Sequence, residues 1–193
     1  SEVSNENQDE IATILEQTEK LDFLIQSLVK LSRMESGIIA VHSEDTTIKQ
    51  MLESIQQQFN VKVREKNITL SLCDTDLHVR CDSKWTVEAL GNIVDNAIKY
   101  TACEGNVQIK VEQYSFFVKI DIIDDGIGIE KEEIPKIFGR FYRSLSVADQ
   151  PGVGIGLFLA REIIQAQKGY IKVTSKRGKG STFSVFLPIA KKE

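Results

Sequence analysis

Two hydrophobic periods alternate along most of this chain, and their alternation restricts it to a fold in which helices pack on a sheet. Stretches such as 69–72 and 108–112 alternate apolar and polar residues, as half-buried strands do. Other stretches repeat apolar residues every three or four positions, the period of a helix with one buried face. We therefore expect an α/β fold, a mixed sheet with helices on one face. The patterns predict helices over 8–36, 46–65, 82–102 and 154–168, and strands over 68–73, 77–81, 106–113, 116–124, 169–175 and 181–188.

The first part of the chain carries a long apolar stripe at helical spacing. Such a stripe on a single helix needs a partner helix to cover it. We therefore predict a long N-terminal helix that precedes the α/β unit, with residues 1–38 and 39–193 as separate domains. The residues of the stripe are Ile11, Ile14, Thr18, Leu21, Leu24, Ile25, Leu28 and Leu31.

The helix expected over 82–102 has a polar face as well as an apolar one. Asn92, Asn96 and Lys99 are four and then three positions apart, so they lie on one side of the helix. Amide oxygens suit Mg²⁺, which usually keeps water and phosphate oxygens in its shell, and an ammonium group suits a phosphate chain. The same pattern also fits an ordinary solvated helix face, and this helix alone does not decide between the two.

The strand expected over 116–124 ends in Asp124-Asp-Gly-Ile-Gly. A carboxylate at a strand end can accept a hydrogen bond from an exocyclic amine, and the glycines Gly126 and Gly128 allow the backbone to approach a flat base closely. These residues are candidates for a base-binding site. An ordinary turn that ends the strand remains the alternative.

Three glycines, Gly152, Gly154 and Gly156, directly precede an apolar run over 157–164 that reads as a helix. Backbone N–H groups at such a helix start point at an anion, and the helix dipole favours negative charge there. The segment is not the dinucleotide fingerprint, because Leu157 stands where that motif needs glycine. Residues 178–181 do not have the spacing of a P-loop. A phosphate cradle and a flexible linker both fit this segment.

Composition excludes several classes of protein. The net charge of −4 at pH 7 provides no basic field for nucleic acid. The longest apolar runs are far shorter than a membrane span, and no signal-peptide pattern opens the chain. Cys73, Cys81 and Cys103 lack CxxC spacing, which favours free thiols in a reducing compartment over disulfides or a zinc site.

The order and spacing of these segments carry more information than any one of them. Asn96 and Asp124 are 28 residues apart, and so are Asp124 and Gly152. Together with Phe-Gly-Arg-Phe-Tyr-Arg at 138–143 and Gly-Ser-Thr-Phe at 180–183, they resemble the ATP-binding region of bacterial sensor histidine kinases, members of the GHKL superfamily. The resemblance implies a Bergerat-type ATP-binding fold, a two-layer α/β sandwich. It also implies a protein-histidine kinase that binds ATP or ADP with Mg²⁺.

The resemblance implies a role for each matching residue. Asn96 is similar to the Mg²⁺ ligand, Asp124 to the adenine-binding carboxylate, and Lys99 and Tyr100 to the pair that lines the phosphates and ribose. Arg143 would reach the phosphates, and Asn92, Lys99 and Arg143 form the implied catalytic set. The implied nucleotide-binding residues are Asn92, Asn96, Lys99, Tyr100, Asp124, Gly126, Gly128, Ile129, Arg143, Gly152, Val153, Gly154, Ile155, Gly156, Leu157 and Thr182.

Two aromatic residues and a loop complete the implied site. The family has a mobile lid over the nucleotide, which corresponds here to about 130–151. Phe138 and Phe141 match the family's phenylalanines, and we favour core packing for both.

The N-terminal stripe has a counterpart in the same family. Leu-Ser-Arg-Met-Glu-Ser-Gly at 31–37 is similar to the end of the second helix of the dimerisation and histidine-phosphotransfer hairpin. The first helix, with the acceptor histidine, would then lie before Ser1, and His42 and His78 are expected to be ordinary surface or loop residues. The implied partners are ATP, a cognate response regulator and, through the hairpin, a second copy of the parent protein. The implied location is the cytoplasmic part of a bacterial inner-membrane or plasma-membrane protein.

Two other functions remain open. The first is an ATPase of the gyrase, Hsp90 and MutL branch, in which a glutamate four positions before the metal-binding asparagine activates water. Here that position is Asn92. The second is a nucleotide-binding scaffold without catalysis, although the nucleotide-contact positions match the family.

Overall fold

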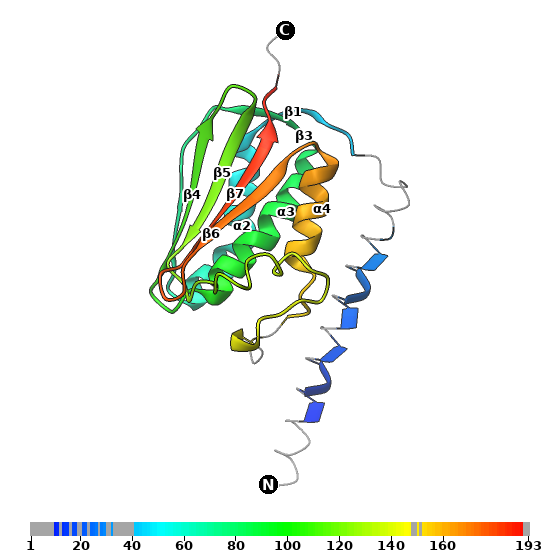
Figure 1. Ribbon diagram of the computed structural model, residues 1–193, viewed down its shortest axis with the longest axis vertical. Coiled ribbons are helices and arrows are strands. Elements are labelled where there is room, and N and C mark those ends of the chain that lie inside the picture. Colours follow the sequence, from blue (N-terminus) through cyan, green and yellow to red (C-terminus); the bar gives the residue numbers. More distant parts are fainter. Residues whose placement is uncertain are drawn as a thin grey trace.

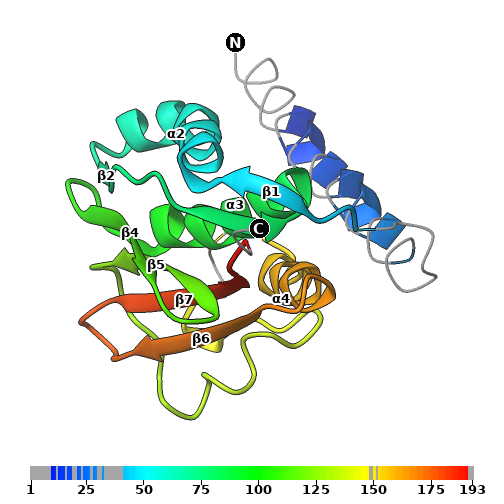
Figure 2. The same ribbon diagram turned by 90° about the horizontal axis from the view of Figure 1, so that it is seen from above.

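The computed structural model describes residues 10, 11, 13–15, 17, 18, 21, 22, 24–26, 28, 29, 32, 41–147, 150 and 152–190. Its main unit has two layers, a five-stranded sheet and three helices (Figure 1). The helices α2, α3 and α4 lie on the same side of the sheet (Figure 2). The expected α/β fold with helices on one face is therefore confirmed. The helices are α2 (Ile48–Glu65), α3 (Ser83–Tyr100) and α4 (Gly156–Ala166), with a short 3₁₀ turn, η1 (Leu145–Val147).

The sheet has the strand order β2-β4-β5-β7-β6. β2 pairs with β4 in parallel, and every other neighbouring pair is antiparallel, so the sheet is mixed as predicted. A second, two-stranded sheet joins β1 to β3. The strands are β1 (Glu44–Thr47), β2 (Thr69–Leu72), β3 (His78–Cys81), β4 (Asn106–Gln113), β5 (Phe117–Asp124), β6 (Tyr170–Ser175) and β7 (Ser181–Pro188).

The core lies between the two layers and follows the two periods of the sequence. Every second residue of β5 and β7 is buried against the helices, including Ile120 and Val185, which are fully buried. The helices contribute residues at three- and four-position steps, such as Ile93 and Ala97 of α3 and Ile163 of α4. This packing brings the end of α3, the end of β5 and the start of α4 to one end of the molecule.

Most boundaries differ from the sequence-based ranges by no more than two residues. Strand β1 was not predicted, because its four residues gain their strand character only by pairing with β3. Helix α2 consequently begins later than expected, at Ile48, and its N-cap Thr47 makes no side-chain capping hydrogen bond. Helix α3 has a complete cap, since the Asp82 side chain accepts a hydrogen bond from the Trp85 backbone N–H.

The described residues between positions 10 and 32 have helical backbone. The ends of the helix predicted over 8–36 and most of the segment 31–37 lie outside the described residues, so the helix bounds and the boundary at residue 38 stay predictions. The large apolar side chains Ile11, Ile14, Leu21, Ile25 and Leu28 are each at least 46% exposed. None of the described helices is long and apolar enough to span a bilayer.

Candidate functional site

Helix α3 forms one wall of a cavity at the end of the molecule. Its apolar face, which includes Leu90 and Ile93, is buried in the core, so its polar residues turn toward the cavity. Asn92 is held in place because its side-chain Nδ2 donates to the Glu88 carbonyl at 3.0 Å. Its Oδ1 lies against Gly156 at the start of α4, where an added Cβ would be only 2.9 Å away. The amide oxygen therefore faces the glycine segment.

The end of β5 forms the floor of the cavity through Asp124, which is only 7% exposed. Its Oδ1 accepts hydrogen bonds from the backbone N–H groups of Gly126, at 3.0 Å, and Ser181, at 3.2 Å. These two bonds hold the carboxyl group and leave Oδ2 for another donor. Burial raises the pKa of Asp124 above its usual range.

Gly126 packs directly on the end of α3. A Cβ at this position would lie 2.5 Å from the Tyr100 carbonyl oxygen, which no neighbouring backbone can accommodate without moving. The Ile127 N–H donates to the same oxygen at 3.2 Å. The loop after β5 and the last turn of α3 are therefore fixed relative to each other.

The glycine segment and the start of α4 form the opposite wall. Gly152 and Gly154 have positive φ angles of 140° and 75°, which favour glycine. A Cβ at Gly154 would lie 2.6 Å from the Tyr142 carbonyl oxygen, so the segment packs closely on residues 141–143. No side chain among the described residues caps the N-terminus of α4. Its first N–H groups therefore remain available to an anion.

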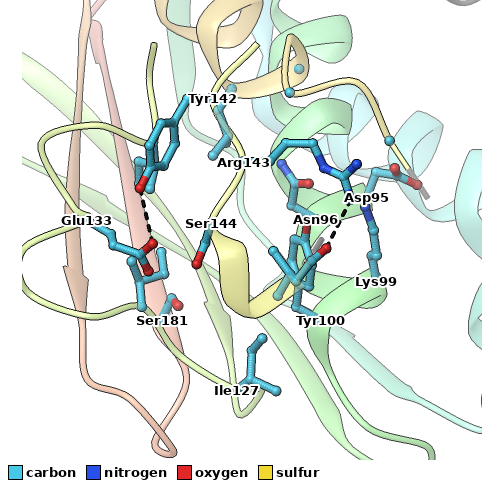
Figure 3. Close-up of a pocket in the computed structure, with 18 of the residues that line it drawn as sticks. Asp95, Asn96, Lys99, Tyr100, Ile127, Glu133, Tyr142, Arg143, Ser144 and Ser181 are labelled. Atoms are coloured by element: carbon cyan, nitrogen blue, oxygen red, sulfur yellow. Dashed lines mark hydrogen bonds between the residues drawn. The ribbon is translucent and has the colours of Figure 1, made fainter. Parts of the chain in front are cut away.

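Two cations meet at this wall. The Lys99 ammonium lies against Gly152, where an added Cβ would be 2.9 Å from it, and 4.8 Å from the centre of the Tyr100 ring. Burial, and then the charge of Arg143, lower the pKa of Lys99. Figure 3 shows Arg143 extending toward the side of the cavity where Asn96 and Lys99 lie. Two positive groups that repel each other in one cavity favour a multiply charged anion between them.

Arg143 is held by its own loop in this structure. Its Nη2 donates to the carbonyl oxygen of Val147 at 3.0 Å and also to that of Gln150. The predicted contact with phosphate would require some of these bonds to be exchanged, which the loop can allow because both acceptors belong to the lid itself.

The lid lines the remaining side of the cavity. Tyr142 donates through its hydroxyl to Glu133 at 3.1 Å, which joins the middle of the lid to its beginning (Figure 3). The cavity has a volume of about 200 Å³, below the roughly 300–1,000 Å³ of typical ligand pockets.

The two phenylalanines of this segment behave differently. Phe138 packs on the core, as predicted, and Arg161 lies 5.6 Å from its ring centre. The prediction for Phe141 was wrong, since its side chain is 54% exposed. Its φ of 61° is an uncommon backbone conformation for a residue other than glycine, and its ring lies at the surface.

The structure brings nearly all of the implied nucleotide-binding residues to one cavity. Gly126 and Thr182 are the exceptions. Gly126 lies beneath the cavity wall, against Tyr100. Thr182 pairs with Ile123 and alternates with buried Ser181 and Phe183, so it faces the opposite side of the sheet, and Ser181 takes the cavity position. Thr182, which the resemblance places among the nucleotide-binding residues, therefore lies outside the lining of this cavity.

Several residues that line the cavity were not predicted. Asp95 lies on the same helix face and could have been found from the period of α3. Ala97 comes from α3 as well. The others come from the lid, from the turns that follow β5 and β6, and from β7, and only folding brings them close to the cavity. They are Ile127, Glu133, Ile137, Tyr142, Ser144, Ser146, Val147, Arg177 and Phe183.

The donor set suits a metal ion that arrives with phosphate. The described residues contain no group of three or more His, Cys, Asp or Glu side chains arranged to hold a metal. Asn96 presents a neutral amide to the cavity. Mg²⁺ is usually bound through one or two protein oxygens, with phosphate and water completing its shell. The cavity fits Mg²⁺ in that form.

Comparison with known proteins agrees with the family resemblance seen in the sequence. The family model described as histidine kinase-, DNA gyrase B- and HSP90-like ATPase matches residues 81–191, which include every element around the cavity. The sensor histidine kinase WalK of Bacillus subtilis is 33% identical over 177 residues, which is 89% of this chain and 29% of WalK. The chain spans about a third of the length of the curated relatives it matches.

Solved structures share the fold. The histidine kinase AdeS of Acinetobacter baumannii superposes with a TM-score of 0.72 at 25% identity, over 94% of this chain and 84% of that one. The histidine kinase ThkA, solved in complex with the response regulator protein TrrA, has a TM-score of 0.67 at 23% identity, over 88% of this chain and 50% of that one. At 23% identity the second likeness shows the fold alone.

Proposed function

The chain belongs to the family of histidine kinase-, DNA gyrase B- and HSP90-like ATPases, and we propose that it is the catalytic ATP-binding region of a sensor histidine kinase. In this proposal it binds Mg-ATP and transfers the γ-phosphoryl group to a histidine on a dimerisation helix. The relative WalK, itself named a sensor histidine kinase, supports this member of the family over the others.

One observation carries the proposal. A buried carboxylate, Asp124, and an anion site made by Lys99, Arg143 and the uncapped start of α4 open into the same cavity. A carboxylate oxygen selects a hydrogen-bond donor, and the cationic wall selects phosphate. A ligand with an amino-substituted base at one end and a phosphate chain at the other satisfies both, and ATP is such a ligand.

Each residue then has a role. Asp124 accepts a hydrogen bond from the adenine amine, and Tyr100 covers the ribose. Lys99, Arg143 and the N–H groups of residues 152–157 hold the phosphates. Asn96 holds Mg²⁺, which neutralises charge that develops on the phosphates during transfer. The protein has little covalent chemistry to perform, because the acceptor imidazole is the nucleophile and catalysis consists mainly of positioning and charge stabilisation.

Asn92 argues against the ATPase branch of the family. Its Nδ2 donates to the Glu88 carbonyl, so its Oδ1 is the atom turned toward the glycine segment. An amide oxygen can accept a hydrogen bond from water but does not take up its proton as a carboxylate would. Hydrolysis should therefore be slow until an imidazole is supplied.

The partners and location of the parent protein are also part of the proposal. The proposed partner is a response regulator, the kind of protein with which ThkA, a protein of the same fold, was solved in complex. The exposed apolar side chains of the N-terminal helical residues support association with a second copy through a helical hairpin. A parent protein anchored in a bacterial membrane would present this region to the cytoplasm.

The test is phosphotransfer in trans. The chain is mixed with Mg-ATP and with a separately produced dimeric hairpin that carries an acceptor histidine. We expect acid-labile phosphate on the hairpin, none on the chain alone, and none on a hairpin whose acceptor is changed from His to Gln. Rapid phosphate release by the isolated chain, unaffected by Asn92→Ala and without label on the hairpin, would overturn the kinase proposal in favour of an ATPase.

A further inference from the structure

The last turn of α3 ends beside the cavity, and its carbonyl groups need partners. The last four carbonyl oxygens of an α-helix have no N–H donor within the helix, and those that are buried need a donor from elsewhere in the protein. The end of α3 is buried, since Thr101, its C-cap, is 2% exposed. The Thr101 N–H donates to Ala97 at 3.1 Å, and the Ile127 N–H donates to Tyr100 at 3.2 Å. The carbonyls of Ile98 and Lys99 remain.

Lys66 supplies the missing donors from a different part of the chain. It is the C-cap residue of α2, and its side-chain ammonium donates to the carbonyl oxygens of Ile98, Lys99 and Thr101, each at 2.9 Å. These three bonds use all three donors of the ammonium group. A positive charge at the C-terminus of a helix is also favoured by the helix dipole. Every carbonyl of the last turn of α3 is then satisfied.

This arrangement links Lys66 to the cavity through the backbone of Lys99. The carbonyl of Lys99 is bound by Lys66, while its side chain reaches Gly152 across the cavity. On the other side, Gly126 and Ile127 hold the carbonyl of Tyr100. The direction of the Lys99 side chain is therefore set by two clamps on its own helical turn, of which Lys66 is one.

We propose that Lys66 is a positioning residue for phosphate binding: by capping the last turn of α3, it holds the Lys99 ammonium at the phosphate end of the nucleotide. This inference rests on the proposed function, because it assumes that the cavity binds a nucleotide. Asp124, which recognises the base, lies on β5 and receives its hydrogen bonds from Gly126 and Ser181. Loss of Lys66 should therefore affect the phosphates and spare the base.

The test compares adenosine with ADP, each measured by calorimetry with the whole chain at a temperature at which every variant is folded. Lys66→Met retains most of the aliphatic side chain and removes the three donors. We expect it to weaken ADP binding about tenfold, the size of a weakened charge-assisted hydrogen bond, and to leave adenosine affinity unchanged. The matched control is Arg64→Met, which removes an exposed cation from the same turn of α2. It should change neither affinity.

A double-mutant cycle separates positioning from a general loss of structure. In a Lys99→Met background the ammonium that Lys66 positions is absent, so Lys66→Met should have little further effect on ADP affinity. Full additivity of the two substitutions would overturn the proposal. So would an equal loss for adenosine and ADP, which is the result expected if Lys66 only stabilises the fold.

A second variant covers the case in which Lys66→Met does not fold. Lys66→Arg retains the charge at the helix end but cannot place three donors at one atom, and we expect an ADP loss of about threefold, again without loss of adenosine affinity. ADP affinity equal to that of the wild type in Lys66→Arg would then overturn the proposal. If the wild-type chain itself does not bind ADP, the proposed function fails. If the wild-type chain binds ADP and Lys66→Met does not alter that binding, only the proposal for Lys66 fails.

Discussion

Helix α3 reaches the cavity with its C-terminal end and helix α4 with its N-terminal end, and the backbone groups at these two ends differ in whether the protein supplies their hydrogen-bond partners. At the C-terminal end of α3, each of the last four carbonyls has a donor, supplied by Thr101, Lys66 or Ile127. At the N-terminal end of α4, no described side chain caps the helix. The far end of α3 shows that this chain can cap a helix start, because Asp82 does so.

The difference distinguishes positioning from binding. A helix end whose polar groups are all satisfied is rigid and can aim side chains such as Lys99 and Tyr100. A helix start whose N–H groups lack protein partners is less stable until an anion binds and supplies the acceptors. The cavity therefore combines the capped C-terminal end of α3, which orients side chains, with the uncapped N-terminal end of α4, which binds the anion.

A change in the glycine segment at the uncapped N-terminal end of α4 should have the largest effect on ADP affinity. Gly154→Ala places a Cβ 2.6 Å from the Tyr142 carbonyl and so separates the glycine segment from residues 141–143. We expect ADP affinity to fall by about 100-fold or more, since several phosphate contacts are lost together. Gly178→Ala is the matched control, with nearly the same φ, 74° against 75°, but open space around its Cβ. Both should lose about 1–2 kcal/mol of stability from backbone strain, and only the first should lose ADP binding, as calorimetry would show.

The two carboxyl oxygens of Asp124 differ in the same way. Its Oδ1 is bound by the protein and Oδ2 is left for the base, so Asp124→Asn should retain the internal bonds and present a donor where adenine needs an acceptor. We expect ADP affinity to fall about 10- to 100-fold. Asp125→Asn, which alters the neighbouring carboxylate that binds Asn106, is the control. Equal ADP affinity of wild type and Asp124→Asn would remove Asp124 from base recognition.

Asp124→Asn should at the same time make the free protein more stable at neutral pH. Because burial raises the pKa of Asp124 in the folded state, its ionised form costs stability above that pKa. The gain in melting temperature should be largest there and should disappear below the unfolded-state value of about 3.9. A lower melting temperature at pH 7 would contradict the burial argument.

The two sides of the cavity should also titrate differently. As pH falls, protonation of Asp124 should weaken ADP binding at a higher pH than an ordinary carboxyl group would, because its pKa is raised. As pH rises, Lys99 should lose its proton below the ordinary value of about 10.4, because burial and Arg143 lower its pKa. Each limb can change affinity by at most about tenfold per pH unit. Asp124→Asn should remove the acid limb alone and Lys99→Met the alkaline limb alone.

The smallest expected effect is in the lid. ADP should engage Arg143 and the glycine segment and so slow amide exchange over residues 139–152, by a few-fold in the part nearest Arg143. Amide exchange with and without ADP measures this directly, with β4 as an internal reference that should not change. Identical exchange in the lid would show that it does not close on the nucleotide.

Much of the site was predictable because it depends on local periods. Asn92, Asn96 and Lys99 share a face in any helix, whatever it packs on, and glycine before an apolar helix exposes its N–H groups wherever it occurs. Thr182 shows where this reasoning fails. Ser181 and Thr182 are both polar and adjacent, and only the pairing of Asp124 with Ser181 between β5 and β7 decides which of them faces the cavity.

The sequence by itself determined the types of element, the faces of the helices and the three segments that form the cavity, because all of these follow from dihedral preference and spacing along a few residues. The tertiary structure decided which polar groups are satisfied and which are left open. Lys66 lies more than 30 residues before the carbonyls it caps, and Arg177 reaches the cavity from the turn between β6 and β7. Hydrogen bonds at a helix end depend on distance in space, and that distance is set only when the helices and the sheet have packed together.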